Sequence, residues 1–146
     1  MDASNPNFSA SGGMLMNKTG TTLIAWPSAS GSVTLTGITT IGDSAFTGCD
    51  SLASVTLPVA TDIGQGAFTG CTSLNNLTFG KDTAPWPVLA GNVFRGTGTG
   101  SLTIHVPSGT ESNYTGTWGV SASVSAGNTY SSVYGGDHKA ITIVGY

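Results

Sequence analysis

Charge is scarce in this sequence. Only 8% of its 146 residues are charged, four of them are Lys or Arg, and the net charge is −3. Four cationic residues are too few to form a basic surface that neutralises phosphates. We therefore expect neither nucleic acid nor an anionic membrane as a partner. No run approaches the ~20 apolar residues that span a bilayer, and the first residues lack the basic start and apolar centre of a signal peptide. The sequence predicts a soluble chain, which is compatible with a secreted protein whose leader is missing.

Histidine and cysteine are equally rare. A zinc site needs about four ligands, and neither Cys49 nor Cys71 has a second Cys or a His at ligand spacing, so we expect no metal and no other cofactor. A serine nucleophile needs a His and usually a carboxylate. His105 has no acidic neighbour in sequence, and His138 follows Asp137 in a Gly-rich segment. We therefore expect no enzymatic activity, with a hydrolase as an alternative that requires distant residues to converge.

What the chain does contain is a repeat. Residues 41–52, IGDSAFTGCDSL, recur as residues 63–74, IGQGAFTGCTSL. Apolar pairs separated by one polar residue recur at a spacing of 22 residues, with a last pair after 27, which is typical of short strands with one buried face. A period of this length predicts a mainly β solenoid of stacked repeats with a parallel sheet. The pairs are Val33 and Leu35, Val55 and Leu57, Leu77 and Phe79, and Ile104 and Val106.

The length suits a single domain, residues 1–146. We expect an N-terminal hairpin cap over residues 5–31, repeats over 32–107, and a C-terminal cap and tail over 108–146. In the repeats, Val93-Phe94 stands where Ala67-Phe68 stood one unit earlier. The interior should be lined by Leu52, Val55, Leu57, Ile63 and Phe68 and by their equivalents in the other repeats.

Both ends of the stack carry signals of capping elements. A turn at Asn17–Gly20 lies between two apolar runs and predicts a β-hairpin that covers the open N-terminal end. At the other end, Ser108 and Glu111 have the spacing of a capping box, with Tyr114 and Trp118 following at helical spacing. This pattern predicts a short helix.

Three further segments have individual expectations. Two prolines around Trp86 disfavour both helix and paired strand, so residues 81–88 should form a loop that projects from the stack. The Gly- and Ser-rich run up to Gly136 should be loop. Residues 140–144 should form a last strand, whose partner is left open.

These motifs resemble the BspA-like leucine-rich repeats, whose unit reads I-G-x-x-A-F-x-G-C-x-S-L-x-x-V-x-L-P. Residues 33–79 match it closely, and residues 5–27 are similar to the hairpin element that precedes or interrupts such repeats. Residues 104–107, with the two aromatic residues after them, are similar to the closing strand and helix. The resemblance implies a right-handed leucine-rich-repeat solenoid in a secreted or surface-attached protein, mostly bacterial, that acts by adhesion or recognition.

The residues between the buried strand positions are polar and almost uncharged. Because side chains two residues apart face the same way, they should form two rows on one exposed surface. This surface, together with the Trp86 loop, is our candidate binding site for a protein or a glycan. The first row is Thr34, Thr56, Thr78 and His105, and the second is Ser32, Ser54, Asn76 and Thr103.

Other interpretations of these features remain. The rows are equally well explained as a polar ladder that favours strand structure and solubility. The domain would then be a spacer or assembly component of a larger adhesin, filament or virion, and self-association would be expected. The two cysteines should lie on adjacent repeats as free thiols that fill space, with a disulfide as the alternative.

Overall fold

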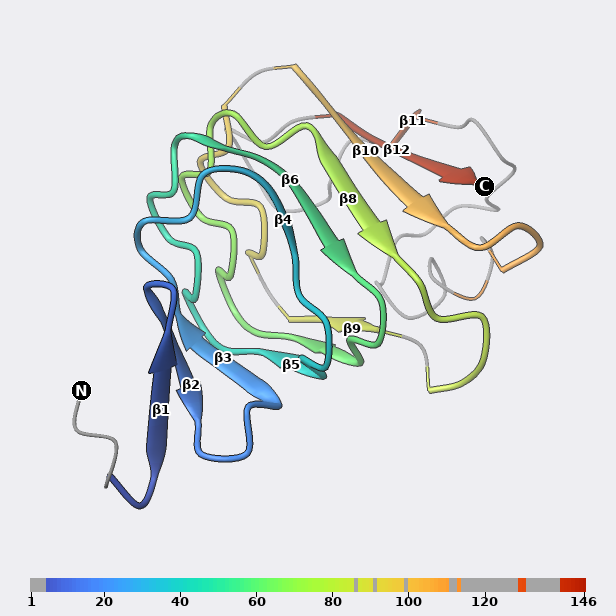
Figure 1. Cartoon of the computed structure of the whole chain (residues 1–146). Helices are drawn as coiled ribbons and strands as arrows, with labels where there is room; N and C mark the ends of the chain where they lie inside the picture. The colour runs from blue at the N-terminus through green and yellow to red at the C-terminus, as the bar shows by residue number, and fades with distance from the viewer. Residues whose placement is uncertain are drawn as a thin grey trace.

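The computed structural model describes residues 5–85, 87–90, 92–98, 100–110, 113, 129–130 and 140–146. Its strands form two six-stranded sheets, which we name sheet A and sheet B (Figure 1). Sheet A has the order β1 (Phe8–Ser11), β2 (Met14–Asn17), β3 (Thr22–Ala25), β5 (Thr40–Ile41), β7 (Asp62–Ile63) and β9 (Val88–Leu89). Sheet B has the order β11 (Thr129–Tyr130), β12 (Ala140–Gly145), β10 (Ser101–Val106), β8 (Asn76–Phe79), β6 (Leu52–Leu57) and β4 (Gly31–Thr34).

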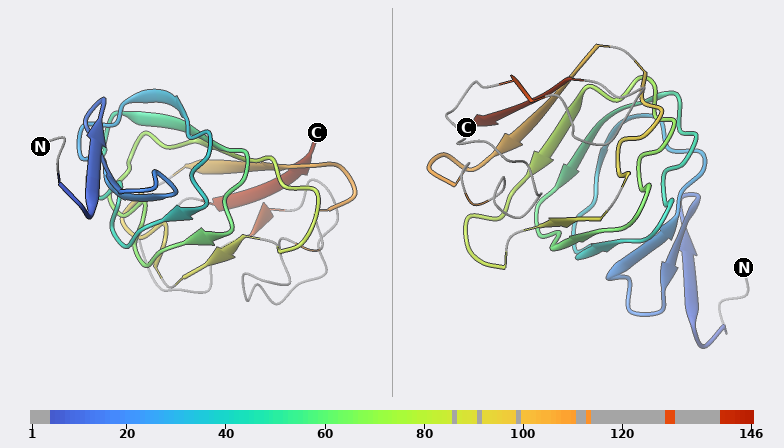
Figure 2. Two further views of the ribbon diagram at one scale, coloured as in Figure 1. Left: turned by 60° about the horizontal axis from the view of Figure 1, so that its bottom comes forward. Right: turned by 180° about the vertical axis from the view of Figure 1, so that it is seen from behind.

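The repeats that begin at β4, β6 and β8 each contribute one strand to each sheet. The chain runs through a strand of sheet B, crosses to a two-residue strand of sheet A, and returns through a glycine-containing turn (Figure 2). Equivalent strands of successive repeats pair in parallel, for example β6 with β8 and β5 with β7. The predicted parallel sheet is therefore present. The second sheet was not predicted, because a strand of two residues is too short to show an alternating pattern.

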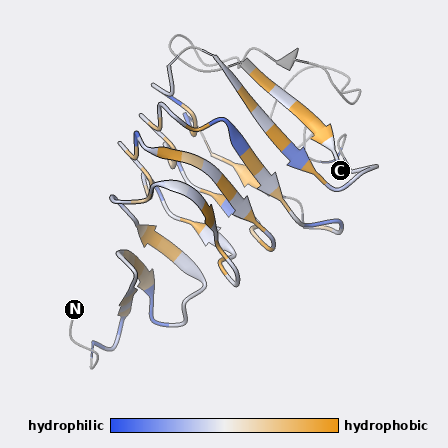
Figure 3. Ribbon diagram, turned by 45° about the horizontal axis from the view of Figure 1, so that its top comes forward, coloured by the Kyte–Doolittle hydropathy of each residue, from blue (hydrophilic) through white to orange (hydrophobic). Residues whose placement is uncertain are grey.

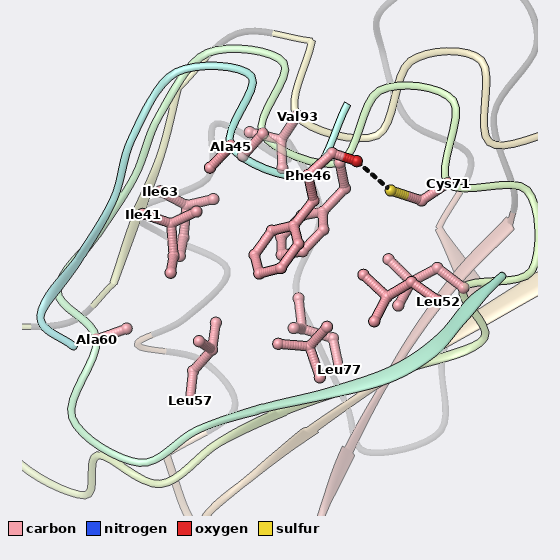
Figure 4. Close-up of a cluster of buried hydrophobic side chains, with 14 of the residues drawn as sticks. Ile41, Ala45, Phe46, Leu52, Leu57, Ala60, Ile63, Cys71, Leu77 and Val93 are labelled. Atoms are coloured by element: carbon pink, nitrogen blue, oxygen red, sulfur yellow. Dashed lines mark hydrogen bonds between the residues drawn. The ribbon is translucent and has the colours of Figure 1, made fainter. Parts of the chain in front are cut away.

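The core lies between the two sheets and runs through all the repeats. The five side chains expected to line it, Leu52, Val55, Leu57, Ile63 and Phe68, are all at most 2% exposed. Figure 4 shows the equivalent side chains of neighbouring repeats lying one behind the other. Because each repeat places the same residue type at the same position, the apolar contacts are made between repeats as much as within them.

Stacked aromatic rings run along the centre of this core. Phe46 and Phe68 have ring centroids 5.1 Å apart, and Phe68 and Phe94 are 5.8 Å apart, with nearly parallel planes in both pairs. Trp26 packs against the free side of Phe46, at 6.2 Å and a tilt of 41°. The indole of Trp26 therefore closes the stack at its N-terminal end. The backbone N–H of Trp26 donates to Ala45 O.

The N-terminal hairpin is present, and it caps only half of the end. β2 and β3 pair in antiparallel fashion around the predicted turn, where Asn17 Oδ1 accepts hydrogen bonds from the N–H groups of Thr21 and Thr22. β1 adds a further antiparallel strand. These three strands extend sheet A beyond β5, whereas β4 remains the last strand of sheet B at this end.

The C-terminal segments depart in part from expectation. β12 pairs in parallel with β10, with Ile143 beside Ile104, so it continues the repeat pattern. The segment expected to be loop up to Gly136 contains β11, which pairs in antiparallel fashion with β12. Residues 81–85 form the expected loop (Figure 1), but Val88 belongs to β9 and pairs with Asp62. Glu111, Tyr114 and Trp118, on which the helix prediction rests, lie outside the described residues.

Candidate functional site

The register of sheet B brings the predicted polar rows together. Ser32, Ser54, Asn76 and Thr103 are successive partners across β4, β6, β8 and β10. Thr34, Thr56, Thr78 and His105 are likewise successive partners. Neighbouring members of a row are therefore about 4.8 Å apart, and the two rows are separated by two residues along each strand. The eight predicted residues form one surface.

This surface, which we name the ladder face, is the side of sheet B that points away from the core. Val55, Leu77 and Ile104, the residues between the two rows, are fully buried, whereas the row members are exposed or half-buried. Figure 3 shows the resulting alternation of polar and apolar segments along β6, β8 and β10. The alternation determines which side of each strand faces solvent.

β12 extends the ladder face by one strand that the sequence did not assign to it. Thr142 pairs with Thr103 and continues the second row, and Val144 pairs with His105 and continues the first. The signal was visible in the alternation of residues 140–144, but only the pairing of β12 with β10 places it here. The face therefore ends in an aliphatic side chain beside the imidazole.

His105 is the ionisable group of the described ladder face, and its side-chain partner is an amide. Its Nε2 lies 3.2 Å from Asn76 Oδ1, and Asn76 Nδ2 donates to Asn75 Oδ1 at 2.6 Å. The amide and the imidazole thus hold one another in place across β8 and β10. The imidazole of a serine hydrolase is usually oriented by a carboxylate, whereas Asn76 supplies an amide at that position. His138 lies outside the described residues.

The cysteines are free thiols inside the core, as predicted. Cys71 Sγ donates to Phe46 O at 3.0 Å, and Cys49 Sγ donates to Trp26 O at 3.2 Å, so each thiol bonds to the backbone of the preceding turn (Figure 4). Burial raises the pKa of the Cys49 thiol, a hydrogen bond with the Ala29 backbone lowers it, and the Asp50 carboxylate raises it further. The raised pKa makes Cys49 a weak nucleophile at neutral pH.

The other chemical groups of the described residues are scattered. No group of three or more His, Cys, Asp or Glu in the described part of the chain has the arrangement of a metal site. An open groove of about 240 Å³ on sheet A includes Asp43 and Asp62. Asp43 Oδ1 already accepts from Gln65 N at 2.8 Å, and Asp62 Oδ2 from Thr61 Oγ1 at 2.8 Å. Both carboxylates thus have local partners.

The aromatic candidate of the predicted site is not placed. Trp86 lies outside the described residues, so its part in the site stays a prediction. Its neighbours are described: Pro87 is buried, and Val88 is 46% exposed in β9 of sheet A. Among the described residues, no helix has the length and apolar character needed to cross a membrane.

Comparison with known proteins gives one match. The family model for the BspA type leucine-rich repeat region matches residues 29–112, in six copies. The match covers the repeats that build both sheets, from the segment before β4 to the end of β10. Neither the curated proteins nor the solved structures contain a match to this chain.

Proposed function

The chain belongs to the BspA-type leucine-rich repeat family, and we propose that it is a non-enzymatic recognition module that binds a protein or a glycan through the ladder face. The observation that carries the proposal is the register of sheet B, which aligns two polar, nearly uncharged rows across neighbouring strands. A surface built on paired strands loses little backbone conformational entropy on binding, because its backbone is already ordered.

The chemistry of the face indicates the kind of partner. Hydroxyl and amide groups dominate it, with one imidazole and, at its edge, Val144. Such groups hydrogen-bond in both directions with sugar hydroxyls and with peptide groups, and they bring no strong charge to attract ions or nucleic acid. Trp86 would add an aromatic contact from the loop between β8 and β9.

Further parts of the proposal have support from the family or from the structure. BspA-type repeats are typical of surface-attached or secreted proteins, and we place this chain there, in an adhesive role in a bacterial protein. Non-enzymatic function agrees with His105 bonding to an amide instead of a carboxylate. Right-handed winding agrees with the strong preference of parallel crossovers for that hand, and a short helix after Ser108 would close the C-terminal end.

The test adds positive charge to the uncharged rows of the ladder face. The double variant Thr56→Lys and Thr78→Lys places two ammonium groups in the middle of one row without touching the core. We expect it to abolish saturable binding in glycan-array and pull-down assays in which the wild-type protein binds. The matched control is Gln65→Lys with Ser73→Lys, which adds the same charge at exposed positions in the turns.

Two outcomes would contradict the proposal. If both double variants bind as the wild type does, the ladder face is not the site. If the wild-type protein binds no glycan or protein but assembles through its ends into oligomers, the domain is a spacer or assembly component, and the rows only favour strand structure and solubility.

A further inference from the structure

The two sheets end differently at the N-terminal side of the molecule. Sheet A continues past β5 through β3, β2 and β1, whereas sheet B stops at β4, the strand of the same repeat as β5. Sheet A therefore overhangs sheet B by three strands. The hairpin visible at the lower left of Figure 1 is this overhang, and β4 is the uncovered edge above it.

The free edge of β4 carries unpaired backbone groups. Leu35 N donates to Thr56 O on β6, and successive residues of a strand direct their backbone groups to opposite sides. Thr34, and Ser32 two residues before it, therefore direct their N–H and C=O groups away from β6. Within the described residues no strand lies on that side.

The β4 edge carries no charge and no proline, and its irregularity is a register shift between Gly31 and Ser32. Edge strands are commonly blocked by lysines, by inward-pointing charges or by proline. β4 reads Gly-Ser-Val-Thr and contains none of these. The side chains of Ser32 and Thr34 are exposed, so β4 is accessible to solvent.

An apolar margin lies along the same edge. Val33 is only half-buried, although its register partners Val55, Leu77 and Ile104 are completely buried. The reason is that each of those residues has a strand on both sides, and Val33 has one on a single side. Three other apolar side chains are packed against this end of the core and remain half-exposed: Met14, Met16 and Trp26.

We propose that the edge of β4 binds an extended strand supplied by a partner protein, which pairs with Ser32 and Thr34 and lays alternate apolar side chains over Val33 and the two methionines. Backbone pairing supplies affinity and the apolar margin supplies specificity, as in other cases of strand addition to a sheet edge. The partner segment is uncharged and alternates apolar with small polar residues, because that is the pattern β4 accepts from β6 on its other side.

The site uses the backbone edge of β4, whereas the ladder face uses outward side chains across the whole of sheet B, so the two proposals can fail separately. The probe is a capped synthetic peptide with the sequence of residues 50–58 of this chain, DSLASVTLP, which contains the strand that pairs with β4 naturally. It is titrated into the ¹⁵N-labelled full chain and followed by amide chemical shifts and hydrogen exchange. We expect shift changes concentrated on residues 31–35 and slower exchange of the Ser32 and Thr34 amides.

Two substitutions test the geometry. Thr34→Pro removes an N–H that makes no bond to β6, and proline is tolerated in an edge strand, so the fold is kept. We expect it to weaken peptide binding about fivefold to tenfold, which is the effect of one lost backbone hydrogen bond and a blocked edge. Val33→Lys should abolish binding by placing a charge in the apolar margin. The matched control, Val59→Lys, changes an exposed valine elsewhere and should leave binding unchanged.

Several results would overturn the proposal. Shift changes spread over the ladder face, no shift changes up to the solubility limit of the peptide, or unchanged binding by folded Thr34→Pro would each do so. A concentration-dependent dimer in sedimentation velocity that Thr34→Pro abolishes would mean that a second copy of this chain occupies the edge instead. The Thr56→Lys and Thr78→Lys variant should bind the peptide normally, even if it has lost the ligand of the ladder face.

Discussion

The inner and outer sides of sheet B differ although their residues alternate along the same strands. On β6, Val55 is completely buried between two neighbouring strands, whereas Thr56 next to it faces outward on the ladder face. The inner rows stay apolar in every repeat, while the outer rows change from Ser and Thr to Asn and His along the sheet. The inner side is therefore constrained by packing, whereas the outer side can vary without disturbing the core.

The largest effect is expected from the aromatic stack on the inner side. Phe68 lies between Phe46 and Phe94 and is fully buried, so Phe68→Ala opens a cavity between three repeats. We expect the free energy of unfolding to fall by about 3 to 5 kcal/mol, measured by denaturant titration with circular dichroism. Phe68→Leu keeps most of the apolar volume and should cost about 1.5 kcal/mol or less. A loss below 1 kcal/mol for the alanine variant would contradict a repeat-spanning core.

The next prediction compares the two sides directly by exchanging their residue types on one strand. Val55→Thr places a hydroxyl in the core and should lower the free energy of unfolding by about 1 to 3 kcal/mol. Thr56→Val, one residue away, makes the reverse change on the ladder face and should alter it by about 0.5 kcal/mol or less. Equal losses for the two variants would show that the outer side is also buried, and the assignment of the ladder face would be wrong.

A smaller effect is expected at the thiol hydrogen bond of the inner side. Cys71 Sγ donates to Phe46 O in the preceding repeat. Thr97, at the same position in the repeat of Phe94, donates its Oγ1 to Phe94 O of its own repeat, at 2.9 Å. Cys71→Thr keeps a donor for a backbone carbonyl, and Cys71→Val has nearly the same shape without one. We expect the valine variant to be about 1 kcal/mol less stable than the threonine variant, because valine cannot donate a hydrogen bond at this position. Equal stability would assign a hydrogen bond at this position no net contribution.

The smallest effect concerns pH and Cys49. Since burial raises the pKa of this thiol in the folded state, the folded chain holds the proton to higher pH than the unfolded chain does. Its contribution is thus fully present below the unfolded pKa, about 9, and is lost as the pH rises further. We expect the stability of wild type to fall more steeply above pH 9 than that of Cys49→Thr. Parallel pH profiles would exclude this contribution.

The repeat could be read from the sequence because it is written twice with few changes. Residues 41–52 and 63–74 fix the period, and the alternation of Val55 and Leu57 with Thr56 fixes the buried side of the strand. The aromatic stack follows from Ala-Phe recurring at one position of the unit. These are local patterns, and a periodic chain stacks like residues on like residues.

Other features left no local pattern. The two-residue strands β5, β7 and β9 are too short to alternate, so sheet A was not predicted. β11 lies in a Gly- and Ser-rich run, and β12 showed a strand pattern that carried no information on its neighbour. For the candidate site, the eight ladder residues could be named in advance, whereas Thr142 and Val144 could not.

The sequence by itself determined the repeat, the inward and outward residues of the strands, and the N-terminal hairpin. The tertiary structure alone decided that this hairpin extends sheet A and leaves β4 uncovered, that β12 joins β10, and that Asn76 meets His105. The physical reason is the range of the interactions. Alternation and turn chemistry act between residues near in sequence, while the order of strands and the state of an edge depend on which distant segments compete for the same hydrogen bonds.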